Sequence, residues 1–471
     1  MVSFSERFAP FAERMRGEGM PEVVVKTFEY YYGQLVAGET GLIPEASIEP
    51  VASLPDAVTF SAGVASAARD ALGKTVLIKL NGGLGTSMGL DAPKSLLVVK
   101  NGLSFLEIAI RQSLRMGVPM VVMNSFATHD QTMAVLAKYS GLRTGIPMAF
   151  QQHKVPKVAM SDLQPANWPD DQRLQWCPPG HGDIYAALMT SGILEELLQA
   201  GYEYAFVSNI DNLGAVLDET LLGYFHSKTY PFMLEVADRT EADKKGGHLA
   251  RLREEQLVLR EVAQCPPEEL AHFQDTTRHK YFNTNNLWLR LRAVKALIET
   301  QGPVLKLPMI RNVKPIDPRQ TDSHKVYQLE TAMGAAIQLF EGATAIRVPR
   351  TRLAPVKTTG DLLKIRSDAY QLTEGYHVVP TPGRKCEDIV IDLDSTFYWS
   401  IDNMDARFPH GAPSLIECER LEVRGDIKFG RNVRLVGNVR LINESAEQLE
   451  VEDGALIDGH ASRAIRSERG I

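Results

Sequence analysis

The sequence predicts an α/β protein with a Rossmann-like, mixed and mainly parallel sheet, followed by a C-terminal left-handed β-helix-like domain. From residue 75 onward, short apolar runs end in polar or glycine-rich turns, and helical segments lie between several of them. Strands that alternate with helices indicate βαβ units and therefore a mostly parallel sheet. After about residue 380, Leu or β-branched residues return every six or so positions with Gly or Asn at turns, which is typical of β-helix coils.

Residues 1–70 are expected to be mainly helical. Apolar residues between Val24 and Leu35 recur at spacings of three and four, and Gly38 follows as a stop signal. We interpret this portion as packing material for the domain that follows.

Residues 71–380 form the predicted core domain. Its strand candidates are TVLIKL, PMVVMN, YAFVSNIDN, FMLEVA and YFNTNNLWLRL. Ser104 and Glu107 have the spacing of a capping box ahead of a helix with periodic apolar residues. Residues 248–262 alternate apolar and charged side chains around a polar centre, which predicts an antiparallel hairpin added to the main sheet.

The end of the core domain is expected in the Pro- and Gly-bearing stretch VVPTPGRK, residues 378–385. An irregular connecting segment, residues 381–411, leads to the β-helix-like domain, residues 412–471. The short β repetition is clearest in residues 421–444, LEVRGDIKFGRNVRLVGNVRLINE.

Composition excludes several classes of function. The chain has 471 residues, of which 44% are hydrophobic and 23% charged, and its formal net charge is −7. Such a balance is ordinary for a globular protein and gives no basic footprint for nucleic acid. No run of 18 apolar residues exists to cross a membrane, and residues 1–20 have no apolar region of a secretory signal.

The four cysteines lie far apart and form no CxxC or Cys/His pattern, so neither a zinc site nor a disulfide framework is indicated. Reduced thiols fit a cytoplasmic protein, which is the expected location. The cysteines are Cys177, Cys265, Cys386 and Cys418.

The first predicted strand runs into the glycine-rich stretch LNGGLGTSMGLDAPKS, residues 80–95. Glycines after a strand expose backbone N–H groups and allow close approach to a polyphosphate, and the carboxyl end of such a strand is where α/β sheets bind ligands. Thr86 and Ser87 add hydroxyl groups, and Lys94 adds a cation next to Pro93. The glycines concerned are Gly82, Gly83, Gly85 and Gly89.

Two standard phosphate loops are excluded by spacing. The segment lacks G-x-x-x-x-G-K-[ST], because its lysine follows Pro93. It fits G-x-G-x-x-G only loosely, since Met88 stands at the last position, and the next strand ends in Asn124 rather than in an acidic residue. A nucleoside triphosphate is therefore a better ligand than a dinucleotide.

The stretch KLNGGLGTSMGLDAPKS strongly resembles the signature of the eukaryotic-type UTP–glucose-1-phosphate uridylyltransferases, also called UDP-glucose pyrophosphorylases. Further blocks agree in order, over roughly residues 20–460: PPGHGDIY, FVSNIDNLGA, KGGHL, FNTNNLW, QLETAMGAAI and PVKTTGDLL. The resemblance implies a nucleotidyltransferase core that converts UTP and glucose 1-phosphate into UDP-glucose and pyrophosphate with Mg²⁺. The sugar phosphate attacks the α-phosphorus in line, so catalysis rests on positioning and charge neutralisation.

The resemblance also implies which residues carry the reaction. Lys94 and Lys357 are expected at the phosphates, and Asp211 is the expected Mg²⁺ ligand at the end of an apolar strand. The loop has Ser87 where the wider bacterial nucleotidyltransferases carry Arg, which leaves more of the charge to the two lysines and the metal.

The implied nucleotide site includes the two residues before the glycines as well as the loop itself. Gly83 and Gln152 are expected to read uracil, with Gly180 packed against the base, although Gln151 remains an alternative to Gln152. The implied nucleotide-binding residues are Leu80, Asn81, Gly82, Gly83, Gly85, Thr86, Gln152 and Gly180.

For the sugar phosphate, the resemblance implies that His181 lies near the phosphate and that polar side chains hold the sugar hydroxyls. The implied residues are His181, Gly182, Asn209, Glu235, Gly247 and Asn285. For Asn285 a role in turn geometry remains an alternative. Within residues 328–340 one helical face is predicted to be core, formed by Leu329, Met333, Ala336, Ile337 and Phe340.

Two other functions remain open. One is the same chemistry on another sugar 1-phosphate, or on several, although Leu84 and Ser87 differ from the GGQGTRLG-like loop of such relatives. The other is a catalytically silent sensor of nucleotide sugars, which would have no need for the charged set Lys94, Asp211 and Lys357. In this family the terminal β domain can mediate assembly, so a homo-oligomer through that domain is also expected.

Overall fold

A computed structural model of the protein describes residues 3–142, 145–253, 256–384, 388–459 and 465–466. Cys386 lies outside these residues, as do parts of the predicted 381–411 and 412–471 segments. Within the described ranges, no helix combines the length and the apolar character that a membrane crossing requires.

The chain divides into two compact units, and each takes more than one stretch of sequence. The first unit comprises Met1–Gly82, Gly117–Asn209 and Leu217–Arg352. The second unit comprises Gly83–Met116, Ile210–Val216 and Leu353–Ile471. The domain boundaries at residues 70, 380 and 411 stay predictions.

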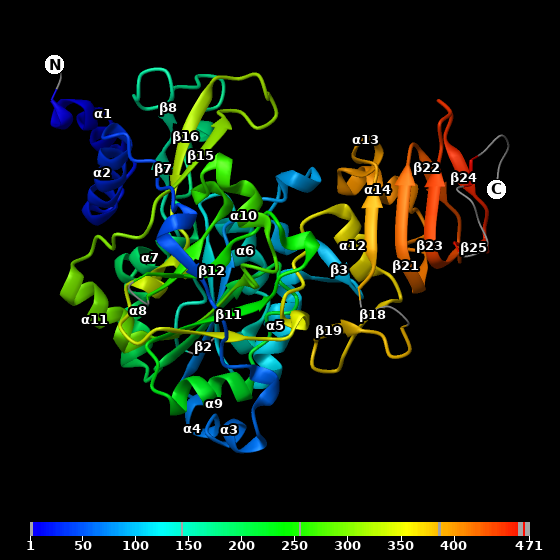
Figure 1. The fold of residues 1–471 in the computed structure, drawn as a ribbon, viewed down its shortest axis with the longest axis horizontal. Coiled ribbons are helices and arrows are strands. Elements are labelled where there is room, and N and C mark those ends of the chain that lie inside the picture. Colours follow the sequence, from blue (N-terminus) through cyan, green and yellow to red (C-terminus); the bar gives the residue numbers. More distant parts are fainter. Residues whose placement is uncertain (1–2, 143–144, 254–255, 385–387, 460–464, 467–471) are drawn as a thin grey trace. The chain divides into compact units, whose positions relative to one another are not determined.

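A mixed ten-stranded sheet forms the centre of the first unit (Figure 1). Its main path is β1 (Ile48–Pro50), β12 (His248–Leu252), β14 (Tyr281–Arg290), β10 (Tyr204–Asn209), β2 (Thr75–Asn81), β5 (Met120–Asn124) and β6 (Ala149–Gln151). Three further strands are β11 (Phe232–Asp238), which pairs with β14 and β17 (Thr344–Arg347), and β13 (Leu257–Arg260), which pairs with β12.

Parallel pairing runs through β10, β2, β5 and β6, and it recurs between β11 and β17. Strands β12, β13 and β14 pair antiparallel, and β12 with β13 is the hairpin expected within residues 248–262. The predicted mixed sheet with a parallel core and an antiparallel patch is thereby confirmed. β2 is buried at every residue, as the uninterrupted apolar run TVLIKL predicts for a central parallel strand.

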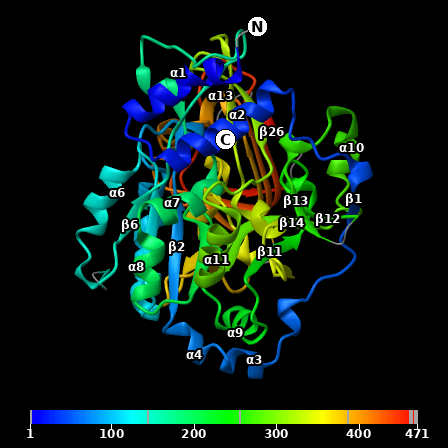
Figure 2. The same ribbon diagram turned by 90° about the vertical axis from the view of Figure 1, so that its left-hand side faces the viewer.

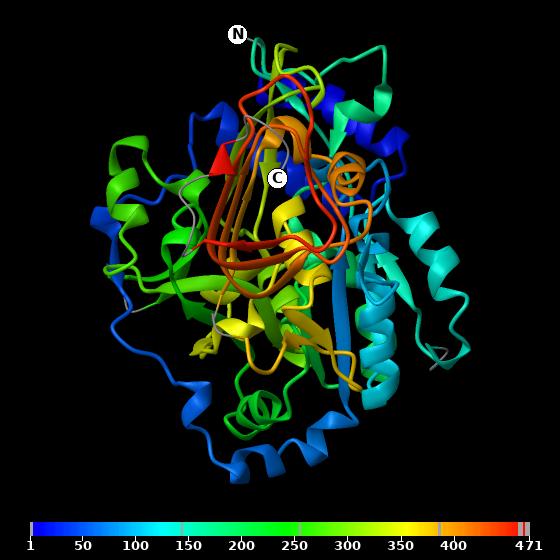
Figure 3. The ribbon, with the colours of Figure 1, turned by 90° about the vertical axis from the view of Figure 1, so that its right-hand side faces the viewer.

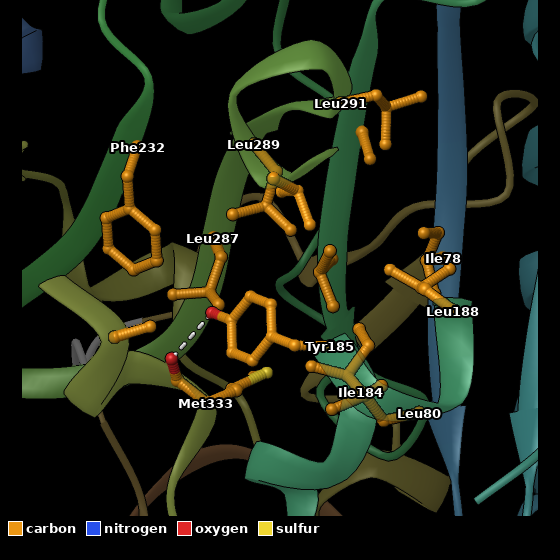
Figure 4. Packing of buried hydrophobic residues seen from close by; sticks show 14 of the residues in the cluster. Ile78, Leu80, Ile184, Tyr185, Leu188, Phe232, Leu287, Leu289, Leu291 and Met333 are labelled. Carbon is orange, nitrogen blue, oxygen red and sulfur yellow. Dashed lines mark hydrogen bonds between the residues drawn. The ribbon is translucent and has the colours of Figure 1, made fainter. Parts of the chain in front are cut away.

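Three helices pack on the sheet and make one large apolar core with it: α7 (Ile184–Thr190), α8 (Ile193–Gln199) and α11 (Leu291–Gln301). Figure 2 views these helices in front of the strands. Figure 4 shows Tyr185 of α7 among Leu287 and Ile184, with its hydroxyl donating to the carbonyl of Met333 at 2.8 Å. The one polar atom of this aromatic side chain is thus satisfied inside the core.

The N-terminal helices are α1 (Phe4–Gly17) and α2 (Glu22–Val36), which confirms the helical prediction for that stretch. They share an aromatic cluster in which the rings of Phe11 and Tyr32 lie 4.6 Å apart. The short α3 (Ala62–Ser66) and α4 (Arg69–Leu72) follow, whereas residues 37–61 contain only two 3-10 turns and the edge strand β1.

The first unit also carries three helices outside that core cluster and two small sheets. The helices are α6 (His129–Leu136), α9 (Glu219–Ser227) and α10 (Leu270–Gln274). The sheets are β15 (Ile310–Pro315), β16 (Lys325–Glu330) and β8 (Val158–Ala159), and the pair β7 (Val155–Pro156) with β9 (Trp176–Cys177).

The predicted helical face within residues 328–340 is only partly right. All five of its residues are buried. However, Leu329 belongs to strand β16, and only the 3-10 helix η11 (Met333–Gln338) follows. The strand pairing of β16 with β15 satisfies the backbone there, so the helical period does not extend back to Leu329.

The second unit contains α5 (Phe105–Met116) and α12 (Thr359–Arg366), with α13 (Ser395–Tyr398) and α14 (Ile401–Arg407). The capping box before α5 is confirmed, because the Glu107 backbone N–H donates to Ser104 Oγ and the Ser104 N–H donates to Glu107 Oε2. Two short antiparallel pairs are β3 (Val98–Lys100) with β4 (Leu103–Ser104), and β18 (Tyr370–Leu372) with β19 (Val378–Pro380).

The C-terminal strands pair in parallel, turn after turn. One sheet contains β20 (Val390–Leu393), β21 (Ser414–Arg424), β23 (Arg434–Ile442), β25 (Leu456–Asp458) and β26 (Ile465–Arg466). A second contains β22 (Ile427–Phe429) and β24 (Leu449–Val451). In Figure 3 the orange and red turns of this part follow one another as stacked coils. Apolar residues such as Leu421 and Val439 alternate inward and are buried.

Candidate functional site

The predicted site residues fall in both units. Those of the first unit are Leu80, Asn81, Gly82, Gln152, Gly180, His181, Gly182, Asn209, Glu235, Gly247 and Asn285. Those of the second unit are Gly83, Gly85, Thr86, Lys94, Asp211 and Lys357.

In the first unit, four parallel strands end at one edge of the sheet. Leu80 and Asn81 end β2, Asn209 ends β10 as the Cα partner of Leu80, and β6 leads into Gln152. Asn81 is buried, and its amide group donates to the side chains of Asn124 and Thr132. This edge is the carboxyl end at which open α/β sheets bind ligands.

Gln152 lies directly against the first glycine of the loop. Its backbone N–H donates to the carbonyl of Asn124 at 2.8 Å, and the residue is 7% exposed. A Cβ atom built on Gly82 would lie 2.3 Å from Gln152 Nε2, so a side chain at this position would displace the Gln152 carboxamide. Gln151, the alternative uracil reader, is exposed at the end of β6.

The loop that carries the predicted phosphate-binding histidine is paired with residues 331–333. The backbone N–H of Gly182 donates to the Thr331 carbonyl at 2.8 Å, and the Met333 N–H donates to His181 Nδ1 at 2.9 Å. Gly180 has φ +80°, and a Cβ there would lie 2.4 Å from the Thr331 carbonyl oxygen. Glycine is therefore required at this position.

His181 is a neutral hydrogen-bond donor in this setting. Burial lowers its pKa to about 4, so the ring is uncharged at neutral pH. Because Nδ1 accepts a hydrogen bond from Met333, the ring proton resides on Nε2. His181 can thus offer one N–H to an anion without carrying a full positive charge.

Two predicted sugar-binding residues lie around an irregularity in strand β14. Asn285 has the left-handed φ of +58°, and its side chain and backbone exchange hydrogen bonds with Asn283 at 2.9 Å each. The Asn283 backbone N–H donates to the Gly247 carbonyl at 3.0 Å. Pairing of β11 with β14 shifts register at this point, after Glu235. Asn285 therefore has the turn geometry that its alternative role implied.

Glu235 is fully buried and its carboxylate already accepts four hydrogen bonds. Arg352 donates to both oxygens at 2.7 Å, Trp288 Nε1 donates at 2.8 Å, and Asn286 Nδ2 donates at 2.9 Å. Lys79 is also buried, on β2, and donates to Ser208 Oγ at 2.8 Å. Burial, with a smaller contribution from the Arg352 guanidinium, lowers the pKa of Lys79 to about 7.

In the second unit the glycine loop folds back on itself. Leu84 and Pro93 form an antiparallel bridge, and the Lys94 backbone N–H donates to the Gly83 carbonyl at 3.3 Å. Two 3-10 turns follow β2 within this loop: η3 (Thr86–Met88) and η4 (Lys94–Leu96). Gly85 packs against the Leu90 side chain, whereas no atom lies within 4 Å of where a Cβ on exposed Gly83 would be.

Lys94 and Asp211 form an ion pair in the second unit. Lys94 Nζ lies 2.6 Å from Asp211 Oδ2, and the two side chains are 14% and 24% exposed. Asp211 stands two residues beyond the end of β10, in the turn rather than at the end of the strand itself. A cation and a carboxylate thus meet in a partly open position.

The turn that holds Asp211 is bonded to the segment that leads into Lys357. The Val356 N–H donates to the Asp211 carbonyl at 3.3 Å, and Asn212 Oδ1 accepts from the Ala354 N–H at 2.9 Å. Lys357 follows directly, is exposed, and stands just before the capping box of α12. Among the described residues, its ammonium group has no ion-pair partner.

Comparison with known proteins shows the family of this chain. The profile of the UTP–glucose-1-phosphate uridylyltransferase family matches residues 25–436. The chain is 42% identical over 395 residues to that enzyme from Hordeum vulgare, covering 82% of this chain and 81% of the barley protein. For the enzyme from Solanum tuberosum, identity is 41% over 394 residues, with 82% and 80% covered. This chain belongs to the UTP–glucose-1-phosphate uridylyltransferase family.

Solved structures of similar proteins agree with the family at the level of the fold. UDP-glucose phosphorylase from Trypanosoma brucei gives a TM-score of 0.88 at 43% identity, with 98% of this chain and 100% of that chain covered. The UDP-glucose pyrophosphorylase from Leishmania major gives 0.89 at 41% identity, with 99% and 100% covered. A mutant of the Leishmania enzyme has been solved in complex with UDP-glucose.

Nucleotidyltransferases of this kind generally use a divalent metal, and Asp211 fits such an ion. Its Oδ1 accepts no hydrogen bond from the described residues, and a carboxylate oxygen is a ligand that hard cations prefer. Within the described part of the chain, no group of three or more His, Cys, Asp or Glu residues is arranged to hold a metal ion. A cation at Asp211 therefore needs further ligands from a bound molecule.

Sequence reasoning missed several residues that contact or adjoin the predicted site residues. Thr331 and Arg352 are partners of Gly182 and Glu235, and both lie far along the chain from them. His153 and Asp183 are a buried pair beside two predicted site residues. Thr331 and Asp183 lie inside the blocks QLETAMGAAI and PPGHGDIY, which resemble the family. Their position in these blocks was the one sequence feature that could have pointed to them.

Proposed function

We propose that the protein catalyses the conversion of UTP and glucose 1-phosphate into UDP-glucose and pyrophosphate by Mg²⁺-dependent in-line uridylyl transfer. What carries the proposal is the ion pair of Lys94 with Asp211, bonded through the main chain to the segment before Lys357, in a member of this family. Two cations and a metal-binding carboxylate near one turn are the groups that a triphosphate needs.

In the proposed reaction, a phosphate oxygen of glucose 1-phosphate attacks the α-phosphorus of UTP. The new O–P bond forms as the bond from the α-phosphorus to the bridging oxygen breaks, and pyrophosphate leaves with that electron pair. The nucleophile is already an anion near neutral pH, so no side chain has to remove its proton. Lys94 and Lys357 neutralise charge on the triphosphate and on the departing pyrophosphate.

We propose Mg²⁺ as the metal, held by Asp211 together with phosphate oxygens of UTP. When bound, the ion supplies charge neutralisation at the reacting phosphates. Lys94 exchanges its pairing with Asp211 for the phosphate oxygens as substrate enters, so the lysine and the carboxylate both face the reacting groups.

For the nucleotide, we propose that the Gln152 carboxamide and the backbone N–H of Gly83 read uracil. The burial of Gln152 against Gly82 supports this choice over the exposed Gln151. The open space beside Gly83 leaves its backbone accessible to a ligand. Leu80, Asn81, Gly82, Gly85, Thr86 and Gly180 complete the proposed nucleotide site.

For the sugar phosphate, we propose that His181 donates its Nε2–H to the phosphate, with Gly182 and Asn209 beside it. Gly247 and Asn285 are proposed to hold sugar hydroxyls. Glu235 contributes through Asn286, because its own oxygens already accept four hydrogen bonds. Directional bonds of this kind allow a site to reject epimers.

We further propose that residues 412–471 form a left-handed β-helix-like domain that mediates homo-oligomer formation, after a core of residues 71–380 and a connection of residues 381–411. The parallel pairing of successive C-terminal strands supports a coil. The proposed assembly follows from the resemblance to the family, in which the terminal β domain can mediate it, and from the general tendency of an end edge of a β-helix to be covered. Sedimentation velocity of the full chain over a range of concentrations tests the assembly; a constant monomer mass contradicts it.

The reaction is tested by pyrophosphate release from purified protein with UTP, Mg²⁺ and a panel of sugar 1-phosphates, with and without EDTA. Fast metal-dependent release with glucose 1-phosphate alone is the expected result. Activity with galactose or N-acetylglucosamine 1-phosphate instead would assign another sugar specificity. No pyrophosphate release with any sugar 1-phosphate, together with binding of UDP-glucose, would indicate a catalytically silent sensor of nucleotide sugars.

A further inference from the structure

His153, the residue that follows the proposed uracil reader, is bonded to a residue 30 positions further along the chain. His153 follows Gln152 directly, and its side chain is 9% exposed. Its backbone N–H donates to Asp183 Oδ2 at 2.7 Å, and its ring Nδ1 lies 2.9 Å and 3.0 Å from the two carboxylate oxygens. Because an ionised carboxylate only accepts, the ring proton on Nδ1 is the donor.

Asp183 uses its side chain for these bonds and not for capping its own helix. It stands at the N-cap of α7, where an Asp side chain normally accepts from the first turn of the helix. Here its side chain, 6% exposed, makes no capping bond, and its carboxylate bonds to His153 instead. Asp183 is also the residue after Gly182, so the pair joins the uracil-reading segment to the loop that carries His181.

Two further contacts hold this segment in the first unit, one made by His153 itself and one by Lys154. Its own Nε2 lies 2.9 Å from Thr190 Oγ1, on the last residue of α7. Lys154 pairs with Glu18 at 2.6 Å, at the end of α1. The Asp183 contact is the one that is buried and made by both main chain and side chain, so it restrains the Gln152–His153 peptide most directly.

We propose that His153 is a positioning residue that, through Asp183, fixes the Gln152 carboxamide for the recognition of uracil over cytosine. Uracil presents an N3–H and a 4-oxygen, whereas cytosine presents a bare N3 and a 4-amino group. A carboxamide held in one orientation matches the first pattern and opposes the second, and a carboxamide free to turn over matches both. This inference rests on the proposed function only in taking Gln152 as the uracil reader.

Two substitutions of His153 separate the Asp183 contact from the Thr190 contact. In His153→Asn, the amide nitrogen stands where Nδ1 stood, so the bond to Asp183 is kept and the bond to Thr190 is lost. In His153→Gln, the longer side chain reaches the place of Nε2 and loses the bond to Asp183. Lys154→Met, which removes the exposed pair with Glu18 from the next residue, is the matched control.

The readout is the ratio of the dissociation constants for CTP and UTP, measured by titration calorimetry with Mg²⁺ on the full chain. Binding does not require turnover, so this test is separate from the pyrophosphate assay, and a misfolded fraction lowers the stoichiometry rather than the ratio. His153→Gln is expected to lower the preference for UTP at least ~10-fold, because a site that reads by hydrogen bonds loses selectivity when they are misplaced.

His153→Asn and Lys154→Met are expected to keep the wild-type ratio to within about threefold. A His153→Gln protein with the wild-type ratio would overturn the inference, and so would equal losses in His153→Asn and His153→Gln. The wild-type protein could release no pyrophosphate while the CTP/UTP ratios change as expected. That result would contradict the proposed reaction and still support the positioning role of His153.

Discussion

Lys94 and Asp211 form a salt bridge, with Nζ and Oδ2 2.6 Å apart. Under the proposed function, phosphate oxygens are expected to replace Asp211 as the partner of Lys94, and a metal ion is expected to replace Lys94 as the partner of Asp211. The pair keeps both side chains at the turn after β10. It also means that removing either member leaves the other without its partner.

Replacement of Lys94 by Ala is expected to lower the turnover number at least ~10²-fold, because a fixed cation at the phosphates is lost. The unfolding temperature should change little, since the side chain is partly exposed. Lys428→Ala, which removes a surface pair with Glu450 in the same unit, is the control and should keep full turnover. Near wild-type turnover in Lys94→Ala would remove this lysine from the mechanism.

Asp211→Asn is expected to raise the Mg²⁺ concentration needed for half-maximal activity at least ~10-fold, because an amide oxygen is a weaker ligand for a hard cation than a carboxylate. Activity is measured as pyrophosphate release over a Mg²⁺ titration at saturating UTP. An unchanged Mg²⁺ midpoint would show that the metal is held elsewhere.

Glu235→Gln is expected to cost about 3 kcal/mol in the free energy of unfolding, because the buried Arg352 charge is left without its carboxylate. Urea unfolding followed by tryptophan fluorescence measures this loss. The surface substitution Lys428→Met should cost no more than about 1 kcal/mol by the same measurement. A loss no larger for Glu235→Gln than for Lys428→Met would argue against a buried ion pair.

Lys79 should make folding stability rise with pH above neutrality. Its pKa is about 7 in the folded protein and near 10.5 in the unfolded chain, so between these values the unfolded state binds the extra proton. Stability then increases with pH, by roughly 2 kcal/mol between pH 7 and pH 9. The measurement is the difference in free energy of unfolding between wild type and Lys79→Met at the two pH values; a difference independent of pH would contradict the lowered pKa.

The sequence was sufficient for those features that a few neighbouring residues determine. The unbroken apolar run of β2, the capping box of Ser104 and Glu107, and the hairpin of β12 and β13 each depend on local pattern and were predicted. Residues 328–340 show the limit of such patterns, since the strand partner of Leu329 overrode the helical period.

Contacts between residues that are distant in sequence could not be predicted from local sequence patterns. Glu235 and Arg352 are 117 residues apart, and the local sequence around either residue does not indicate its partner. His153 and Asp183 are 30 apart and join only when β6 and α7 pack together. The division of the chain into two interleaved units was likewise not predicted, because it depends on which segments contact one another rather than on composition.

The C-terminal strands repeat one relationship: Ser414 pairs with Arg434, and Arg434 pairs with Leu456. Successive strands are therefore joined by the same parallel pairing, as between the repeats of repeat proteins. A duplication or deletion of one whole turn of the chain would change the number of stacked strands. Each remaining strand would still have a neighbouring strand to pair with. Relatives can thus differ in the length of this end of the chain by whole turns while the Lys94–Asp211 turn stays unchanged.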